Sequence, residues 1–166
     1  MTEQGLWPDP AKVSGLLVDT NLLVLYVVGA VSRSRIEQFK RTRQYTIADY
    51  DLLIRVLEQF KRLYTVPHVM AEVSNLTDLS GGERLKARQL LKEMLTTLEE
   101  PEMPSARAAE HGVYQDLGLA DAAIASVARD QACAVLTDDL DLYLSLISDD
   151  VPVVNFTHLR ASAWGL

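Results

Sequence analysis

Acidic side chains stand at points of this sequence where short apolar runs end. Asp19 directly follows the run 15–18, and the pair Asp138 and Asp139 comes just after the run 134–136. Short apolar runs are typical of buried parallel strands, whose carboxyl ends meet along one edge of a sheet. Carboxylates gathered there repel one another unless a cation lies between them. Such hard oxygen ligands suit Mg²⁺ or Mn²⁺, which keep water molecules and coordinate phosphate oxygens of a substrate.

Glu72 is a third acid of this set. We expect it on the helix that begins at Pro67, directly after a strand over 63–66. Its neighbours Val69 and Val73 predict an apolar helix face that also includes residue 72. A carboxylate on such a face is costly without a partner, which favours a functional role for Glu72.

Asp121 is the fourth acid, near the start of an alanine-rich helix that follows Gly118. Each acid also has a structural interpretation when it is taken alone. Asp19 can cap the next helix, and Asp121 gains from the dipole of its own helix. Asp138, Asp139 and Asp141 can form a plain turn and helix cap. The four acids together, at one edge of a sheet, favour a metal site.

The elements expected between these acids alternate between strands and helices. Thr46 opens one helix with a capping-box pattern, Gly29 is expected to end another, and Ser105 to cap a third. The alternation predicts an α/β fold with a parallel sheet covered by helices on both faces and right-handed crossovers. The predicted strands are 15–18, 63–66, 134–136 and 151–154, and the predicted helices are 22–28, 35–41, 46–62, one from 67, 81–98, 105–116 and 119–129.

Length and composition indicate one soluble globular domain. The chain has 166 residues, of which 48% are hydrophobic and 23% charged. These values exclude a disordered chain, a collagen and a disulfide scaffold. The single cysteine, Cys133, lies in an apolar run and is expected to be a buried, inert thiol. The apolar run 22–31 is too short to span a bilayer and the first residues do not resemble a signal peptide, so a cytoplasmic location is expected.

Positive charge collects in one segment of an acidic chain. Residues 33–62 hold eight basic and four acidic residues, a balance of +4, against −11 for the remainder and −7 for the whole. Lys and Arg contacts to phosphates give sequence-independent affinity for nucleic acid, so this segment is a candidate RNA-binding surface. A solvated helical face is the alternative. The RNA-binding candidates are Arg33, Arg35, Lys40, Arg41 and Arg43.

Four short motifs in order resemble those of PIN-domain nucleases. They are Leu16-Leu17-Val18-Asp19-Thr20-Asn21, Pro67-His68-Val69-Met70-Ala71-Glu72-Val73, Gly118-Leu119-Ala120-Asp121-Ala122-Ala123-Ile124 and Val135-Leu136-Thr137-Asp138-Asp139. The resemblance covers about residues 15–156. It implies one PIN-like domain over 1–166, a three-layer sandwich around a central parallel sheet, with a basic helical insertion at about 33–62. That insertion is long for the short toxin ribonucleases of the family.

The resemblance also assigns roles to single residues. It implies that Asp19, Glu72, Asp121 and Asp139 are the catalytic residues and the ligands of Mg²⁺ or Mn²⁺. Asn21 and Thr137 match positions that usually support the four acids by hydrogen bonding. Asp138 occupies a variable place beside the fourth acid and is counted among the supporting residues, and Asp141 is a weaker candidate for that acid.

The function implied is a divalent-metal-dependent endoribonuclease, which is a candidate toxin of a toxin–antitoxin pair. RNA, an antitoxin protein and a second copy of the chain are the candidate partners, and no membrane is expected. The alternative is a PIN-like module that binds RNA or protein without cleavage. The histidines predict no catalytic set, since His111 is expected in mid-helix and His158 in the C-terminal tail. His68 is expected to pack at a helix start, and the alternative is that it approaches the acidic pocket, because it stands four residues before Glu72.

Overall fold

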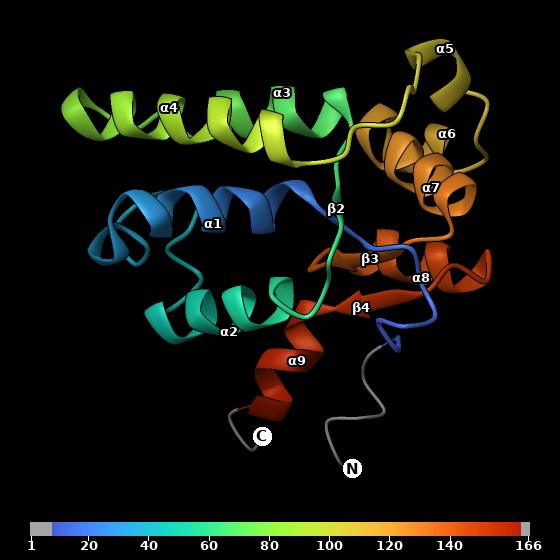
Figure 1. Ribbon diagram of the computed structural model, residues 1–166, viewed down its shortest axis with the longest axis horizontal. Coiled ribbons are helices and arrows are strands. Elements are labelled where there is room, and N and C mark those ends of the chain that lie inside the picture. The colour runs from blue at the N-terminus through green and yellow to red at the C-terminus, as the bar shows by residue number, and fades with distance from the viewer. Residues whose placement is uncertain (1–7, 164–166) are drawn as a thin grey trace.

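A four-stranded parallel sheet forms the centre of the molecule. The computed structural model describes residues 8–163. The strands are β1 (Leu16–Val18), β2 (Leu63–Tyr64), β3 (Ala134–Thr137) and β4 (Val153–Asn155), arranged in the order β2-β1-β3-β4. Their parallel pairing and the helices around them form the three-layer α/β sandwich predicted from the sequence (Figure 1).

Helices connect the strands and cover the sheet. In Figure 1, α3 and α4 lie above α1 and α2 lies below it, and α1 packs against all three. The helix α7 packs against β3 and against α5 and α6, and α8 packs on β3 and β4. The bounds are α1 (Thr20–Val31), α2 (Ile47–Leu57), α3 (Pro67–Leu76), α4 (Gly81–Thr97), α5 (Ser105–Ala108), α6 (Tyr114–Leu117), α7 (Leu119–Gln131), α8 (Leu140–Ser148) and α9 (Phe156–Ala163), with a 3₁₀ turn η2 (Arg33–Arg35). Within these residues no helix is both long and apolar enough to cross a membrane.

The register of β1 and β3 brings two of the acidic motifs together. Val18 pairs with Leu136, and the backbone N–H of Asp19 donates to the carbonyl oxygen of Leu136 at 2.9 Å. Both strands are fully buried, as expected for strands covered on two faces. The sequences that follow β1 and β3 therefore leave the same edge of the sheet as neighbours.

Gly29 does not end the first helix as predicted. The helix α1 continues to Val31, and Gly29 lies inside it, against the ring of Tyr50 on α2. A Cβ atom at residue 29 would stand 2.3 Å from the Tyr50 Cδ2 atom. The absence of a side chain at this position thus allows close packing of two helices, and it is not a stop signal.

Gly29→Ala should therefore lower the free energy of unfolding by about 1–2 kcal/mol. Overpacking in a core usually destabilises a protein by about 1–3 kcal/mol. The better helix propensity of alanine offsets at most about 1 kcal/mol of this loss. Gly82→Ala is the matched control, because nothing lies within 4 Å of a Cβ at that helical position. Chemical denaturation of both variants measures the effect, and equal stability of the two would contradict this packing role.

Several predicted helix bounds were also wrong. Residues 35–41 do not form a helix, since turns follow η2 up to the Thr46 cap of α2. The predicted helix over 105–116 is broken into α5 and α6. In the turns over 35–41, Ile36 is fully buried and Phe39 packs against the core, so tertiary contacts override the helical tendency of this segment. The capping box of Thr46 and Asp49 is confirmed, but α2 ends at Leu57, not at residue 62.

Cys133 is buried, as predicted. Burial raises the pKa of its thiol to about 12. Because the thiolate is the reactive form, this cysteine is an inert core residue.

Candidate active site

Asp19 lies at the carboxyl end of β1, and its carboxylate is buried with only 6% exposed. Its Oδ1 atom accepts a hydrogen bond from the backbone N–H of Thr20 at 2.7 Å. Its Oδ2 atom accepts from the Thr137 hydroxyl at 2.6 Å. The pKa of Asp19 is raised to about 6, mainly by burial. The two hydrogen bonds lower this pKa, and the charges of Asp138 and Asp139 add to the effect of burial.

Thr137 connects Asp19 with the turn after β3. Its side chain is fully buried, and while its hydroxyl donates to Asp19 its oxygen accepts from the backbone N–H of Asp139 at 3.0 Å. Asp139 caps α8 by accepting from the backbone N–H of Leu142 at 3.0 Å. The Asp139 side chain is thus both the N-cap of α8 and a member of the acidic cluster.

Glu72 is exposed, which corrects the apolar surrounding predicted for it. Residue 72 turns outward on α3, while Val69 and Val73 are buried. One carboxylate oxygen of Glu72 accepts from the Thr20 hydroxyl at 3.0 Å. Thr20 therefore bridges Asp19 and Glu72, one through its backbone and the other through its side chain.

Asp121 faces the other three acids from the first turn of α7. Burial raises the pKa of its carboxyl to about 7, and the charges of Asp19, Asp139 and Glu72 contribute in that order. Repulsion of this kind falls off with distance, so the four acids, on four helices or their caps, form one electrostatic cluster.

The donor set suits a divalent cation, although the side chains are not gathered around one point. In the part of the chain that the structure describes, no group of three His, Cys, Asp or Glu side chains stands close enough to hold a metal. Asp19, Glu72 and Asp139 each turn an oxygen to a protein donor. Oxygen ligands that repel one another fit Mg²⁺ or Mn²⁺, and Asp19, Glu72, Asp121 and Asp139 would hold it.

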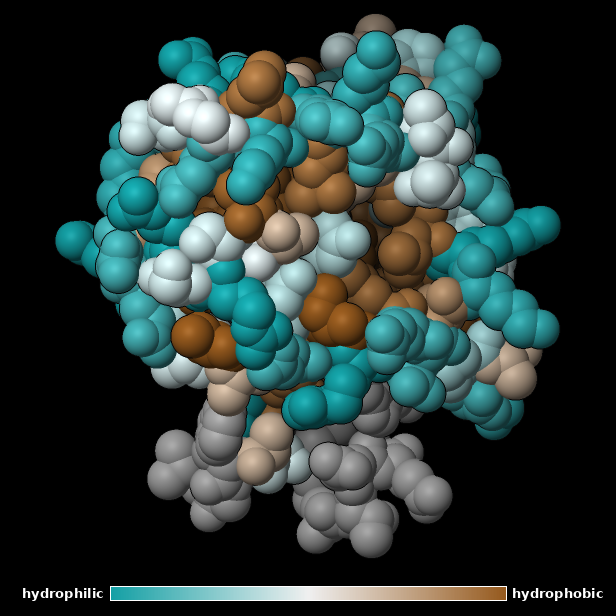
Figure 2. All heavy atoms as spheres, turned by 60° about the vertical axis from the view of Figure 1, so that its left-hand side comes forward, coloured by the Kyte–Doolittle hydropathy of each residue, from teal (hydrophilic) through white to brown (hydrophobic). Residues whose placement is uncertain are grey.

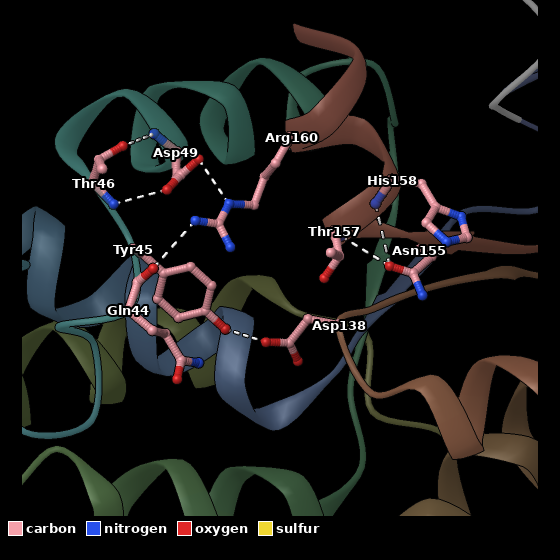
Figure 3. A network of polar contacts seen from close by, with 9 residues as sticks. All are labelled: Gln44, Tyr45, Thr46, Asp49, Asp138, Asn155, Thr157, His158 and Arg160. Atoms are coloured by element: carbon pink, nitrogen blue, oxygen red, sulfur yellow. Dashed lines mark hydrogen bonds and ion pairs between the residues drawn. The ribbon is translucent and has the colours of Figure 1, made fainter. Parts of the chain in front are cut away.

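Asp138 stands beside this cluster with both oxygens engaged. Oδ1 accepts from the Asn21 amide at 3.4 Å. Oδ2 accepts from the Tyr45 hydroxyl, as Figure 3 shows. The charge of Asp138 acts on Asp19 but is not among those that act on Asp121. This arrangement distinguishes Asp138 from Asp139, and Asp139 stays the predicted fourth acid.

Thr20 and Tyr45 were missed by the sequence reasoning. Thr20 stands inside the first motif, where a hydroxyl directly after a candidate acid is a usable signal. Tyr45 lies far from every motif, in the turns before α2, and no pattern in the sequence indicates that it reaches Asp138.

The basic segment is partly neutralised by its surroundings. Arg33 pairs with Asp51 at 2.6 Å, Arg35 with Glu83 at 2.9 Å and Lys40 with Asp78 at 3.0 Å. Arg41 and Arg43 are exposed, and no ion pair of theirs occurs within residues 8–163. Of the five RNA-binding candidates, Arg41 and Arg43 therefore keep the most charge available for phosphates.

The three histidines make separate contacts. His68 lies 2.8 Å from the Ser105 hydroxyl, and His158 packs edge-on against Tyr143. His111 is not in mid-helix as predicted but in the turn between α5 and α6, 3.7 Å from Asp149.

An apolar groove opens between α1, α2 and the end of α4. Its volume is about 290 Å³, and its lining includes Leu23, Tyr26, Ile54, Leu57 and Met94. Figure 2 shows apolar side chains gathered in a hollow on one face, bordered by hydrophilic side chains.

Comparison with known proteins agrees with this architecture. The fold is similar to that in the crystal structure of PAE2754 from Pyrobaculum aerophilum, with a TM-score of 0.51 and 19% sequence identity over 89% of this chain and 95% of that one. No curated protein matches the chain. The family model of the PIN domain matches residues 16–144, which include all four acids. The chain therefore belongs to the PIN-domain family.

Proposed function

We propose that this protein is a divalent-metal-dependent endoribonuclease. The observation that carries the proposal is the electrostatic cluster of Asp19, Glu72, Asp121 and Asp139, together with membership in a family whose members are generally nucleases. A Mg²⁺ or Mn²⁺ ion held there would supply an activated water and stabilise charge on the phosphate. A non-catalytic PIN-like module is the competing proposal, and the presence of all four acids speaks against it.

The chain's own residues do the positioning in this proposal. Thr137 and the Thr20 N–H hold the Asp19 carboxylate in one orientation from two sides. The Thr20 hydroxyl holds Glu72, and the cap of α8 holds Asp139. These donors hold three of the acids before substrate binds, and the acids must still turn toward a common point to share a cation.

A cleavage assay with metal titration tests the proposal. Wild-type protein is incubated with single-stranded RNA, single-stranded DNA and a structured, tRNA-like RNA, over a range of Mg²⁺ and Mn²⁺ concentrations and with a chelator. Metal-dependent cleavage of RNA is expected, and cleavage should stop in the chelator. Binding of RNA without any cleavage would favour the non-catalytic module.

Mg²⁺ or Mn²⁺ should also stabilise the native fold. A ligand that binds only the folded state adds RT ln(1 + [L]/Kd), about 2.7 kcal/mol at a hundredfold excess over Kd. Thermal unfolding should therefore shift upward with metal in wild type and not in the variant Glu72→Gln/Asp121→Asn. An equal shift in both proteins would place the metal elsewhere.

Arg41 and Arg43 are the members of the basic segment that we propose to contact RNA. In an Asp19→Asn background, changing both to Ala should weaken binding of every RNA sequence alike. The log–log salt slope should become shallower by roughly 0.7 per lost contact on a single strand. The matched control changes Arg33 and Arg35, whose charges are paired, and should alter the slope less. Unchanged affinity and slope in the first variant would mean that these side chains are only a solvated surface.

A role as the toxin of a toxin–antitoxin pair is the finer part of the proposal. The apolar groove between α1, α2 and α4 supports it, since such a groove suits the apolar face of a partner helix. Induced expression in a bacterial host tests it. Growth arrest by wild type but not by Asp19→Asn is expected, and normal growth with both would argue for a housekeeping nuclease.

A further inference from the structure

Tyr45 connects a segment outside the motifs with the edge of the candidate site. Its side chain is almost fully buried, with 1% exposed, and its hydroxyl donates to Oδ2 of Asp138 (Figure 3). It is therefore shielded from any substrate. The Tyr45 hydroxyl donates a charge-assisted hydrogen bond to a carboxylate that follows a strand far away in the sequence. Such a bond holds the carboxylate in one orientation.

The C-terminal helix holds Tyr45 in place. The guanidinium of Arg160, on α9, lies 5.3 Å from the centre of the Tyr45 ring. The same guanidinium donates to Asp49 at 2.9 Å and to the carbonyl oxygen of Gln44 at 3.1 Å. Phe156 packs edge-on against the ring, with centroids 6.4 Å apart. Contacts on the ring and on the adjacent backbone leave Tyr45 one orientation.

Asp138 passes this constraint on to the site. Its second oxygen accepts from the Asn21 amide nitrogen at 3.4 Å, so the orientation of the Asn21 amide follows from that of Asp138. Asp138 also stands between Thr137, which donates to Asp19, and Asp139. A fixed Asp138 side chain therefore also restrains the turn 137–139, which carries Thr137 and Asp139.

We propose that Tyr45 is a positioning residue of the active site, which acts by holding Asp138 and, through it, Asn21 and the turn 137–139 beside Asp19. The consequence for catalysis rests on the proposed nuclease function. The positioning itself does not, because it concerns contacts within the folded protein. Two measurements separate the two parts.

The first measurement is independent of activity. The side-chain amide signals of Asn21 are followed by ¹⁵N NMR in wild type, Tyr45→Phe and Tyr50→Phe, with Asn21→Asp used for assignment. Tyr50 is the matched control, because it is also buried and its ring packs on Gly29 and Arg33 away from Asp138. A shift of the Asn21 signals in Tyr45→Phe alone is expected. No shift, or an equal shift in both variants, would overturn the proposal.

The second measurement is RNA cleavage. Direct partners of metal ligands typically contribute about 10–100-fold, and Tyr45 acts on the ligands only through Asp138, so kcat should fall in Tyr45→Phe by up to about tenfold. KM should stay unchanged, because the buried ring does not touch substrate, and Tyr50→Phe should match wild type in both parameters. Adding Tyr45→Phe to Asp138→Ala should cause no further loss, since the two residues act through one bond.

The outcomes distinguish the two proposals. Wild type that cleaves no RNA would end the nuclease proposal, while the Asn21 signals would still decide the positioning role. A loss of kcat that is fully additive in the double variant, or a fall that only tracks a lower melting temperature, would make Tyr45 a core residue without a positioning role.

Discussion

Asp19→Asn is expected to abolish metal-dependent cleavage while the protein stays folded. The amide keeps the shape of the carboxylate, and its oxygen can still accept from Thr137 or the Thr20 N–H. It loses the negative charge that would hold the cation. A metal ion contributes several kcal/mol of transition-state stabilisation, so the rate should fall on the order of a thousandfold or more.

The same substitution should not lower the stability of the metal-free protein. Burial and the neighbouring charges of Asp138 and Asp139 disfavour ionised Asp19, and a neutral amide removes that cost. The melting temperature in chelator should therefore be equal to or above that of wild type. Asp141→Asn is the control, because Asp141 is exposed in the first turn of α8, and its activity should be unchanged. Cleavage at the parental rate by Asp19→Asn would remove Asp19 from the metal site.

The metal-free protein should lose stability as the pH rises from about 4 to about 7. In the folded state the pKa of Asp19 is raised to about 6 and that of Asp121 to about 7, from an ordinary value of 3.8. The native state then holds protons in this window that the unfolded chain has released, so the free energy of unfolding falls as pH increases. A tenfold difference in proton affinity corresponds to about 1.4 kcal/mol, so the two carboxyls together should contribute a few kcal/mol.

Urea denaturation at several pH values, in the presence of a chelator, measures this slope. Asp19→Asn and Asp121→Asn should each flatten it, and saturating Mg²⁺ should reverse it by favouring the ionised acids. Asp49→Asn is a contrasting variant, because the pKa of Asp49 is lowered and not raised. Burial raises that pKa, but hydrogen bonds from Arg160 and Thr46 outweigh the effect of burial. A metal-free protein whose stability is flat between pH 4 and 7 would contradict the acidic cluster.

The parallel sheet was predictable because strands that are buried on both faces appear in the sequence as continuous apolar runs. The runs at 15–18 and 134–136 became β1 and β3 with bounds shifted by one residue. Pro67 and the Thr46 capping box marked helix starts correctly, since both depend on local backbone chemistry. Gly29 misled the prediction because its role depends on Tyr50, a residue of another helix.

The sequence by itself determined the chemistry of this protein: which acids follow which strands, and hence which family the chain belongs to. Local periodicity and capping are short-range properties, so they can be read along the chain. The tertiary structure decided the environment of each acid. It exposed Glu72, joined it to Asp19 through Thr20, brought Tyr45 against Asp138 and placed Arg160 over the Tyr45 ring. These contacts, with the hydrogen bond from Thr137 to Asp19, span 52 to 118 positions. Only packing of the helices around the sheet can bring such distant residues together.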